Sequence, residues 1–424
     1  MSHSQILIIG AGAAGLLAAR ELSASGRKVV VLEGGARTGG RVLDIENPGC
    51  PFPVALGAEF IHGDLQLSFD LLNEAGLTYT LVDQKGVRME AGKEVSEERS
   101  GQWKEFMDRL NTLEADTTLS DFLFSFFNDD RYAVLRADVL RFAEGYDAAD
   151  PDRVSVFSLR DEWSYQGLQY RVDEGYGRLI DFLVDKCQRV GCNIHLHKVV
   201  TRICWREGFV EILTSNGESF TADKLIVTVP PGVLRIPSGN AGSLSFEPAL
   251  PEQTRAFGEI GFGAVIKIVI VFKSAFWVDT VSKDVTFLLS NGEIPTWWLH
   301  STNTLPILYG WIAGPRSARM DSFTDKQIMQ KAVRSLALTF GLSENFLYGQ
   351  IEDFSLFNWN TNPFSKGGYT FMTLEGREAV ELLRSGVQDT IYFAGEAIYN
   401  GPHGGTVEAA LISGREAARR ILDN

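Results

Sequence analysis

The sequence contains few cysteines and no long apolar run. Its four cysteines, in a chain of 424 residues, show no paired metal-ligand spacing, and so few thiols do not make a disulfide framework. No stretch reaches the roughly 18 apolar residues that a membrane-spanning helix needs. A first strand that begins by about residue 5 leaves no room for a secretion signal. These absences predict reduced thiols, no metal site, no membrane span and a cytoplasmic location.

Positive charge is also scarce, because 40 Lys and Arg residues face 54 Asp and Glu residues, which gives a net charge of −14. This balance disfavours nucleic acid as a partner, since a phosphate backbone is bound by Lys and Arg. It is compatible with a cationic substrate, although acidic charge that keeps a protein soluble would produce the same balance. With 45% hydrophobic and 22% charged residues, the composition is that of a soluble globular protein of two or three domains.

The N-terminal segment contains a nucleotide-binding pattern. An apolar strand over 5–9 leads into Gly10, Gly12 and Gly15, which are followed by a helix, a second strand and Glu33. The first glycine permits a tight turn, the second lets a pyrophosphate approach the backbone, and the third lets helix and strand pack closely. The helix N-terminus presents free N–H groups to phosphates. Glu33 follows Gly12 by 21 residues, where an acid can bond the hydroxyls of an adenosine ribose. Together these features predict a bound dinucleotide.

The loop after the second strand extends this pattern. Residues 34–41 contain four glycines and two arginines, Arg37 and Arg41. Arginine forks match phosphate oxygens bidentately, and the glycines leave room for that approach. A merely flexible loop would have the same composition, but its place within a nucleotide-binding unit favours a role in ligand binding.

Hydrophobic periodicity divides the rest of the chain. Apolar residues recur at three- and four-residue intervals within 65–165, which predicts a helical region, with Pro151 near the start of one helix. From residue 193 the period changes to two, and Asn216-Gly217 lies between two such segments, as in a β-hairpin. The fully apolar run 225–229 is typical of a strand in a buried parallel sheet. Further helices are predicted over 179–190, 322–341 and 407–422.

Two segments carry polar groups in apolar surroundings. The predicted strand 262–272 contains one charge, Lys267, which must reach water, pair with an acid or be neutral in a site. A lysine there is an unusual choice for stability and indicates a function. Residues 52–63 include Glu59 and His62 in a short apolar stretch, although a lone histidine is more often structural.

The C-terminal segment contains a second glycine-rich turn. A loop rich in aromatics and glycine, 357–369, precedes a strand that ends in Gly395-Glu396, and the turn 401–406 opens the last helix. The N-terminus of that helix is a second place where a helix dipole can face an electron-rich ligand. Two such helix ends suit a long dinucleotide with a polar ring system.

These motifs resemble those of the flavin-containing amine oxidases, the group of monoamine oxidases, polyamine oxidases and histone-lysine demethylases. The resemblance rests on the turn 10–15 with Glu33, on the loop 37–41, and on 393–396 followed by 406–408. It covers nearly the whole chain.

The resemblance implies an α/β fold with two domains. The Rossmann-like FAD-binding domain would comprise residues 1–79, 182–256 and 362–424. The substrate-binding domain, a mixed sheet with helices, would comprise 80–181 and 257–361. The flavin ring is expected between the domains, where pockets usually form.

The resemblance also assigns cofactor-binding residues. Glu33 would bind the adenosine ribose, and the backbone of Val200 would meet the adenine. Arg37, Arg41 and Glu396 would hold the pyrophosphate region. The full set is Gly10, Gly12, Ala14, Gly15, Glu33, Gly34, Arg37, Gly40, Arg41, Gly57, Ala58, Glu59, Val200, Trp359, Gly395, Glu396, Thr406 and Val407.

A smaller set is implied for the reaction. Lys267 would hold a water near flavin N5, Trp359 would pack beside the ring, and Tyr369 would be one aromatic of the substrate cage. The catalytic set is Lys267, Tyr369, Trp359 and His62, and the substrate-contacting set is Glu59, His62, Trp298, Tyr369 and Thr406.

Departures from the family pattern narrow the expectation. Gly368 stands where monoamine oxidases carry the cysteine that binds flavin, so the FAD is expected to be noncovalent. Thr406 replaces the second aromatic of their cage. The segment 57–63 resembles most the polyamine oxidases, whose matching histidine, here His62, lies in the substrate tunnel. Glu59 could then attract the distal ammonium of a polyamine.

The expected protein is an FAD-dependent amine oxidase. It would move a hydride from the carbon beside an amine nitrogen to flavin N5, giving an imine that hydrolyses to a carbonyl, while O2 is reduced to H2O2. A polyamine is favoured, and a monoamine or an L-amino acid, with Arg171 or Arg316 binding the carboxylate, is an alternative. Two further alternatives are a flavin-dependent desaturase or isomerase of the same fold and a non-enzymatic protein like the GDP-dissociation inhibitors.

Overall fold

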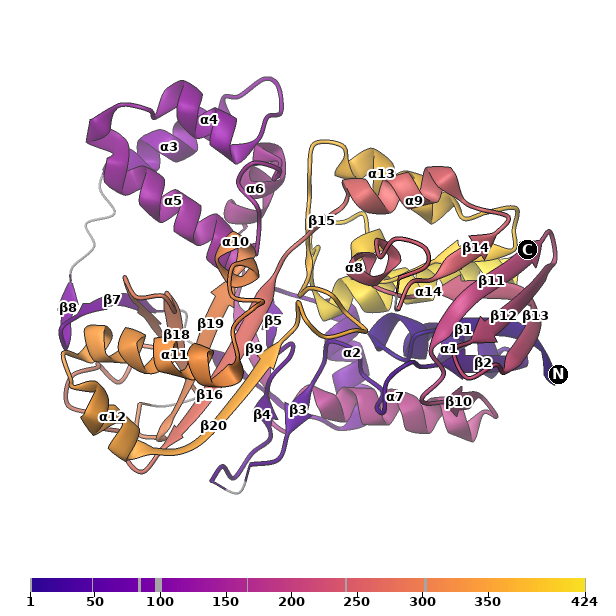
Figure 1. The fold of residues 1–424 in the computed structure, drawn as a ribbon, viewed down its shortest axis with the longest axis horizontal. Helices are drawn as coiled ribbons and strands as arrows, with labels where there is room; N and C mark the ends of the chain where they lie inside the picture. Colours follow the sequence, from indigo (N-terminus) through magenta and orange to yellow (C-terminus); the bar gives the residue numbers. More distant parts are fainter. Residues whose placement is uncertain are drawn as a thin grey trace.

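The computed structural model describes residues 2–47, 49–82, 85–95, 101–165, 167–240, 242–300 and 303–423. The ribbon has two lobes, and both termini lie in the same one, on the right in Figure 1. Each lobe is built on one large β-sheet. Among the described residues, no helix is long and apolar enough to cross a membrane.

The sheet of the first lobe has eight strands. They are β1 (Ser2–Ile9), β2 (Val29–Leu32), β10 (Asn193–His195), β11 (Val200–Arg206), β12 (Phe209–Thr214), β13 (Ser219–Val227), β14 (Ser245–Glu247) and β22 (Ile391–Phe393). β1 lies between β2 and β13 and is parallel to both, and β22 pairs with β13 in parallel. The predicted hairpin at Asn216-Gly217 is confirmed, since β12 and β13 pair antiparallel around it. The predicted parallel strand at 225–229 is confirmed up to Val227.

Helices cover both faces of this sheet. On one face α1 (Ala13–Ala24), α2 (Gln66–Ala75), α7 (Gly177–Arg189) and α14 (Val407–Asp423) share a hydrophobic core with β1 and β2. On the other, α9 (Pro251–Glu259) and α13 (Gly376–Ser385) pack on the alternate residues of β1, with α8 (Pro231–Leu234) nearby. This three-layer arrangement places the N-terminus of α1 at the carboxyl ends of β1 and β2.

The sheet of the second lobe has seven strands, mostly antiparallel. They are β20 (Ile351–Asn358), β16 (Val265–Phe272), β19 (Ile307–Ala313), β18 (Thr296–Leu299), β17 (Phe287–Leu289), β7 (Gly86–Glu90) and β8 (Lys93–Val95), in that order. Helices α11 (Asp325–Phe340) and α12 (Glu344–Gln350) pack against the even-numbered residues of β16. Side chains alternate along a strand, so Lys267 lies on the opposite face, together with Val269 and Val271.

A group of helices stands at one end of the second sheet, in purple in Figure 1. They are α3 (Gly101–Asn111), α4 (Leu119–Phe126), η1 (Asp130–Tyr132), α5 (Ala133–Tyr146) and α6 (Val156–Trp163), and the short α10 (Gly314–Ala318) contacts α5. The prediction of a helical region over 65–165 is therefore wrong in part, since β7, β8 and β6 (Tyr79–Val82) interrupt it. These strands are short, β6 is half-exposed and β8 is fully exposed, so they carry too few apolar residues for a period to appear. Pro151 lies in a turn, and the next helix begins later, capped by Ser155.

Small sheets link the lobes. β9 (Gln169–Val172) pairs with both β5 (Phe60–His62) and β6, β15 (Gly261–Phe262) pairs with β21 (Thr370–Phe371), and β3 (Asp44–Ile45) pairs with β4 (Val54–Ala55). A 3-10 turn, η2 (Glu396–Ile398), follows β22. Three of the predicted domain boundaries divide single elements: 79/80 falls within β6, 181/182 within α7, and 256/257 within α9.

Candidate active site

A cavity of about 2010 Å³ lies between the two lobes. It is larger than the roughly 300–1,000 Å³ of an ordinary small-molecule pocket, so a dinucleotide and a second ligand both have room. All of the predicted cofactor-binding residues line it except Gly15. The predicted catalytic and substrate-contacting residues line it as well.

The glycine turn after β1 is built for a ligand at one end of this cavity. Gly10 has φ +106°, and a Cβ on Gly15 would lie 2.1 Å from the Gly10 carbonyl oxygen, so helix and strand touch there. Gly12 is the N-cap residue of α1, has no side-chain cap, and has open space where a Cβ would be. No side chain caps the first N–H groups of α1, so these groups are available to a ligand in the cavity.

The acid and arginines predicted near this turn organise the surrounding loops. Glu33 accepts hydrogen bonds from the N–H groups of Ala11, at 2.8 Å, and Gly35, at 2.7 Å, which fixes its carboxylate at the cavity edge. Arg37 donates to carbonyls within its own loop, including that of Val42 at 2.8 Å. Arg37 thus shapes the loop.

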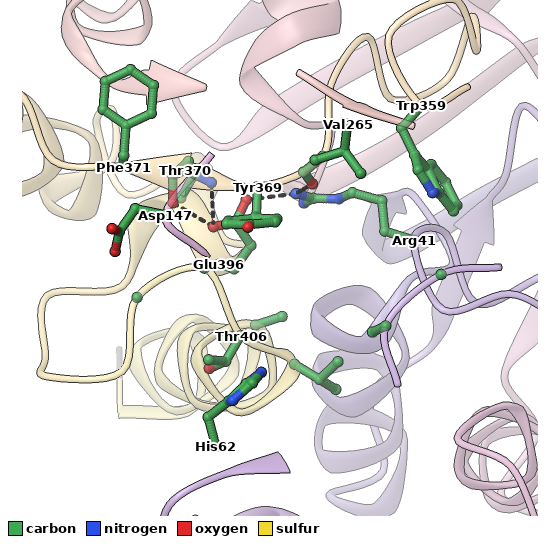
Figure 2. Close-up of a pocket in the computed structure, with 18 of the residues that line it drawn as sticks. Arg41, His62, Asp147, Val265, Trp359, Tyr369, Thr370, Phe371, Glu396 and Thr406 are labelled. Carbon is green, nitrogen blue, oxygen red and sulfur yellow. Dashed lines mark hydrogen bonds and ion pairs between the residues drawn. The ribbon is translucent and has the colours of Figure 1, made fainter. Parts of the chain in front are cut away.

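Arg41 joins the two ends of the chain. It donates to Glu396 at 2.6 Å and to the carbonyl of Gly368 at 2.7 Å, and Glu396 also accepts from the Thr370 hydroxyl (Figure 2). Next to this pair Gly395 has φ +137° and open space at its Cβ position. The C-terminal Gly-Glu motif therefore meets the N-terminal arginine loop at the cavity wall.

Lys267 and Glu59 form a buried ion pair. The Lys267 ammonium donates to Glu59 at 2.7 Å and to the Gly57 carbonyl at 3.1 Å, and the Arg171 Nε donates to Glu59 at 2.9 Å. Burial lowers the pKa of Lys267, against the raising effect of Glu59. Burial alone would raise the pKa of Glu59, but Lys267 and Arg171 together lower it to about 2.

These contacts correct one prediction. Both oxygens of Glu59 are engaged by cations of the protein, so Glu59 is not a free anchor for a substrate ammonium. The signal in the sequence was an acid in an apolar stretch, and its partners lie 112 and 208 residues away.

Aromatic side chains form the walls near Lys267. Trp298 stacks on Tyr309 with centroids 5.6 Å apart, and its indole N–H points at Glu59. The Trp359 indole donates to the Leu56 carbonyl at 3.0 Å. Tyr369 donates to the Tyr146 carbonyl at 2.6 Å, and burial raises its pKa, so the ring is a neutral, fixed surface.

His62 and Thr406 lie together across the cavity from Tyr369 (Figure 2). Burial lowers the pKa of His62 to about 4, so its imidazole is neutral at neutral pH. Its ring meets the edge of Tyr146 at 5.9 Å. The Thr406 hydroxyl accepts from the N–H of Ala409 at 3.1 Å, which caps α14. Val407 is the first residue of that helix.

Comparison with known proteins decides the family. A family model described as flavin containing amine oxidoreductase matches residues 13–422. The chain belongs to this family. It is 28% identical to "Polyamine oxidase 4" of Oryza sativa subsp. japonica, over 99% of this chain and 90% of the rice protein. It is 27% identical to human "Lysine-specific histone demethylase 2", over 99% of this chain but only 53% of the human protein.

A solved structure shares the fold of this flavin amine oxidase. Putrescine oxidase, in its wild-type form bound to putrescine, superposes with a TM-score of 0.80 over all of both chains, at 19% identity. The family membership makes the protein an FAD-dependent amine oxidase. The residues fit that cofactor, because Gly12 and the uncapped start of α1 leave an open cradle for phosphates, and Glu33 lies beside it.

The sequence interpretation missed an acid pair in this oxidase. Asp147, the C-cap residue of α5, and Glu162 of α6 both line the cavity, and Asp147 lies beside Tyr369 in Figure 2. Asp147 is 5% exposed; the Trp163 indole donates to its Oδ2 at 3.0 Å, while its Oδ1 has no hydrogen-bond partner among the described residues. Burial, then the neighbouring Glu162, raises the pKa of Asp147, and burial raises that of Glu162.

The two arginines considered for a substrate carboxylate are already engaged. Arg171 bonds Glu59 and also donates to the His300 carbonyl at 3.0 Å. Arg316 lies 3.9 Å from Glu144.

Proposed function

We propose that this enzyme oxidises diamines or polyamines, using O2 and releasing H2O2. The observation that carries the proposal is the buried carboxyl group of Asp147 beside Tyr369, which interacts with Glu162 at the cavity wall and has one oxygen without a hydrogen-bond partner among the described residues. Two neighbouring carboxyl groups, one of them buried, share a proton or take a cation, because their negative charges repel each other. The distal ammonium of a diamine is such a cation, and it would bond Asp147 directly.

The alternatives explain the acid pair less well. A monoamine has no second charge to place there, and the apolar substrate of a desaturase or isomerase would leave the acids in contact with carbon. An L-amino acid needs a cation for its carboxylate, and the partners of Arg171 and Arg316 disfavour both candidates. The match to an oxidoreductase family over residues 13–422 disfavours a protein without enzymatic activity.

The reacting amine would bind between aromatic walls. Amine oxidation requires a neutral nitrogen, and Tyr369 and Trp359 offer it uncharged surfaces. Burial keeps the Tyr369 hydroxyl protonated, and its bond to the Tyr146 carbonyl fixes the ring. His62 is neutral as well, so the wall around the reacting carbon holds the amine without protonating it.

Lys267 would act on water. FAD, when bound, supplies the electron acceptor for the carbon beside the amine nitrogen. The Lys267 ammonium uses two of its three N–H groups on Glu59 and Gly57, so the third can hold a water against the cavity. That water is placed for hydrolysis of the imine product or for proton delivery when O2 takes up the electrons.

We further propose that the FAD is noncovalent and that the domains follow the two sheets. Gly368 offers no sulfur, and a Cβ there would lie 2.4 Å from the Val265 side chain. Acid precipitation should release FAD into the supernatant. The FAD-binding domain would be built on the eight-stranded sheet, with the whole of α7, and the substrate-binding domain on the seven-stranded sheet with α3 to α6.

One experiment tests the substrate class. The holoenzyme is mixed without air with putrescine, spermidine, spermine, tyramine or an L-amino acid, and loss of the flavin absorbance is recorded. Bleaching by the diamines and polyamines at lower concentration than by tyramine supports the proposal, and air should then restore the absorbance with one H2O2 formed per amine. Bleaching by amino acids alone, or by no amine, contradicts it.

A further inference from the structure

The carboxylate of Glu59 is shared between two cations. Lys267 reaches one oxygen from β16, and Arg171 reaches the other from β9. All three side chains are buried, with 1% of the Lys267 side chain and 5% of the Glu59 side chain exposed. The Trp298 indole N–H lies 3.3 Å from both oxygens of Glu59. One acid therefore compensates two cations in a site with little water.

Most other titratable groups around Lys267 are neutral. His300, after β18, has its pKa lowered to about 4 by burial and then by Arg171, so it is neutral. Burial raises the pKa of Tyr309 in β19, which keeps its hydroxyl protonated. Asp44 of β3 also raises the pKa of Lys267, by more than Arg171 lowers it, and burial raises the pKa of Asp44 itself. Glu59, Asp44 and Arg171 are thus the charges that act on Lys267.

The geometry also restricts where the ammonium points. Nζ lies 5.2 Å from the centroid of Trp298 and 5.4 Å from that of Tyr309, so two ring faces confine it. Bonds to Glu59 and to the Gly57 carbonyl fix two of its three N–H groups. Lys267 lines the cavity, so the remaining N–H is the one available to a ligand or a water there.

We propose that Glu59 is a positioning residue that aims the Lys267 ammonium into the cavity, and that Arg171, by drawing on the same carboxylate, sets how readily Lys267 gives up its proton. The proposal rests on the proposed function, in which Lys267 serves amine oxidation. It explains why two cations converge on one buried acid, an arrangement that stability alone does not favour.

The proposal makes a prediction of opposite sign for two substitutions. Glu59→Gln removes the negative charge and should lower the apparent pKa of Lys267. Arg171→Met removes a positive charge and should raise the apparent pKa of Lys267, because Lys267 is then the only cation bonded to the Glu59 carboxylate. Opposite charges within hydrogen-bond distance shift a pKa by about 1 to 3 units, so the downward shift in Glu59→Gln should be measurable. The upward shift in Arg171→Met should be smaller, because Arg171 contacts Glu59 and is the weakest of the charges that act on Lys267. A residue that serves packing alone would not produce shifts in opposite directions.

The first measurement needs no amine substrate. The flavin of the holoenzyme is reduced by light in the absence of air and mixed with oxygenated buffer at values between about pH 6 and 10, which spans the range of a lowered lysine pKa. The rate of return of the flavin absorbance is fitted for its apparent pKa. Lys267→Met should abolish the titration. Glu59→Asp, which keeps the charge but shortens the side chain, should keep the apparent pKa and slow the reaction.

The second measurement is the melting temperature of each variant against pH. In Glu59→Gln, Lys267 is buried and charged without a counter-ion, and raising the pH neutralises it. The loss of melting temperature relative to the wild type should therefore shrink as the pH rises, and Lys267→Met should remove that trend.

A matched control is Glu74→Gln. Glu74 also pairs with one arginine, Arg20 at 2.7 Å, and one lysine, Lys186 at 3.1 Å, but it is 37% exposed on the surface. Its substitution should leave both profiles unchanged.

The outcomes separate the two proposals. Shifts of Glu59→Gln and Arg171→Met in the same direction, no shift in either, or a titration that survives in Lys267→Met overturn the inference. If Glu59→Gln does not fold with flavin, the inference is tested by Arg171→Met alone, in which the apparent pKa of reoxidation should shift upward. If no amine bleaches the flavin, the proposed function is contradicted. The pH profiles of flavin reoxidation and of melting temperature still test the inference, because neither measurement uses an amine.

Discussion

Replacing Asp147 by Asn tests the proposed substrate class most directly. The change keeps the shape of the side chain and leaves an oxygen for the Trp163 indole, which donates at 3.0 Å. It removes the negative charge that would bond a distal ammonium. A hydrogen bond to a charged group contributes about 1.5–3 kcal/mol, which corresponds to a loss of about 10- to 150-fold in affinity.

The assay compares two amines of equal length. kcat and KM are measured for putrescine and for butylamine, which lacks the second nitrogen. In Asp147→Asn, KM for putrescine should rise by about 10- to 150-fold, with little change for butylamine. Asp108→Asn is the control, because Asp108 is an exposed acid of α3 that is not among the residues lining the cavity. An unchanged putrescine-to-butylamine ratio in Asp147→Asn would refute the role of the acid pair.

The pH dependence has a definite sign. Burial and Glu162 raise the pKa of Asp147, so its protonated form persists above the usual range of a carboxyl group. Only the ionised form attracts an ammonium, so the affinity for putrescine should rise as the pH climbs through that raised pKa. The rise should be absent in Asp147→Asn.

Three further predictions concern the cofactor cradle and the fold. Gly15→Ala places a Cβ 2.1 Å from the Gly10 carbonyl oxygen and should lower the free energy of unfolding by about 1–3 kcal/mol or more. Gly12→Ala places a Cβ that meets nothing within 4 Å, so it should weaken FAD binding without changing the free energy of unfolding. Equal effects of the two substitutions on urea unfolding would contradict this. Glu408 accepts hydrogen bonds from the N–H and the hydroxyl of Ser68, each at 2.7 Å, and so caps α2. Glu408→Gln should therefore lower the free energy of unfolding by about 1.5–3 kcal/mol. A negligible loss would show that water can replace the cap. His62 has its pKa lowered from 6.5 to about 4, so the unfolded chain binds its proton first, and stability is lost as the pH falls from 6.5 towards 4. His62→Asn should remove up to about 3 kcal/mol of that loss, and an unchanged acid transition would mean that the histidine is not buried neutral.

Local signals in the sequence were enough for the parts of the fold that local chemistry dictates. The turn from Gly10 to Gly15 and the hairpin at Asn216-Gly217 depend on backbone conformations that few residue types adopt. The presence of those residue types in the sequence is therefore enough to predict both turns. Lys267 was singled out for the same reason, since a charge inside an apolar strand is rare. Helix α11 was visible through its period and begins at a Thr324 capping box.

Contacts between distant segments were beyond such signals. The sequence predicts a substrate anchor at Glu59 because its two cations, Arg171 and Lys267, lie 112 and 208 residues further along the chain, and no pattern in 52–63 refers to them. Asp147 belonged to a stretch that reads as a helix break, Asp147 to Pro151, and only the approach of α6 places Glu162 beside it. The strands from β6 to β8 were missed because they are short and stabilised by pairing rather than by a buried face.

The bond between Arg41 and Glu396 has a consequence for synthesis of the protein. The two residues are 355 positions apart, which a ribosome covers in about 20 to 70 s at typical rates. β13 begins at Ser219, so for about the first half of that interval β1 can pair with β2 but still lacks β13, and the wall that Glu396 contributes is missing until the end. The nascent chain therefore exposes one edge of an apolar strand for roughly 10 to 40 s before it can hold its cofactor, and such an edge is prone to aggregation.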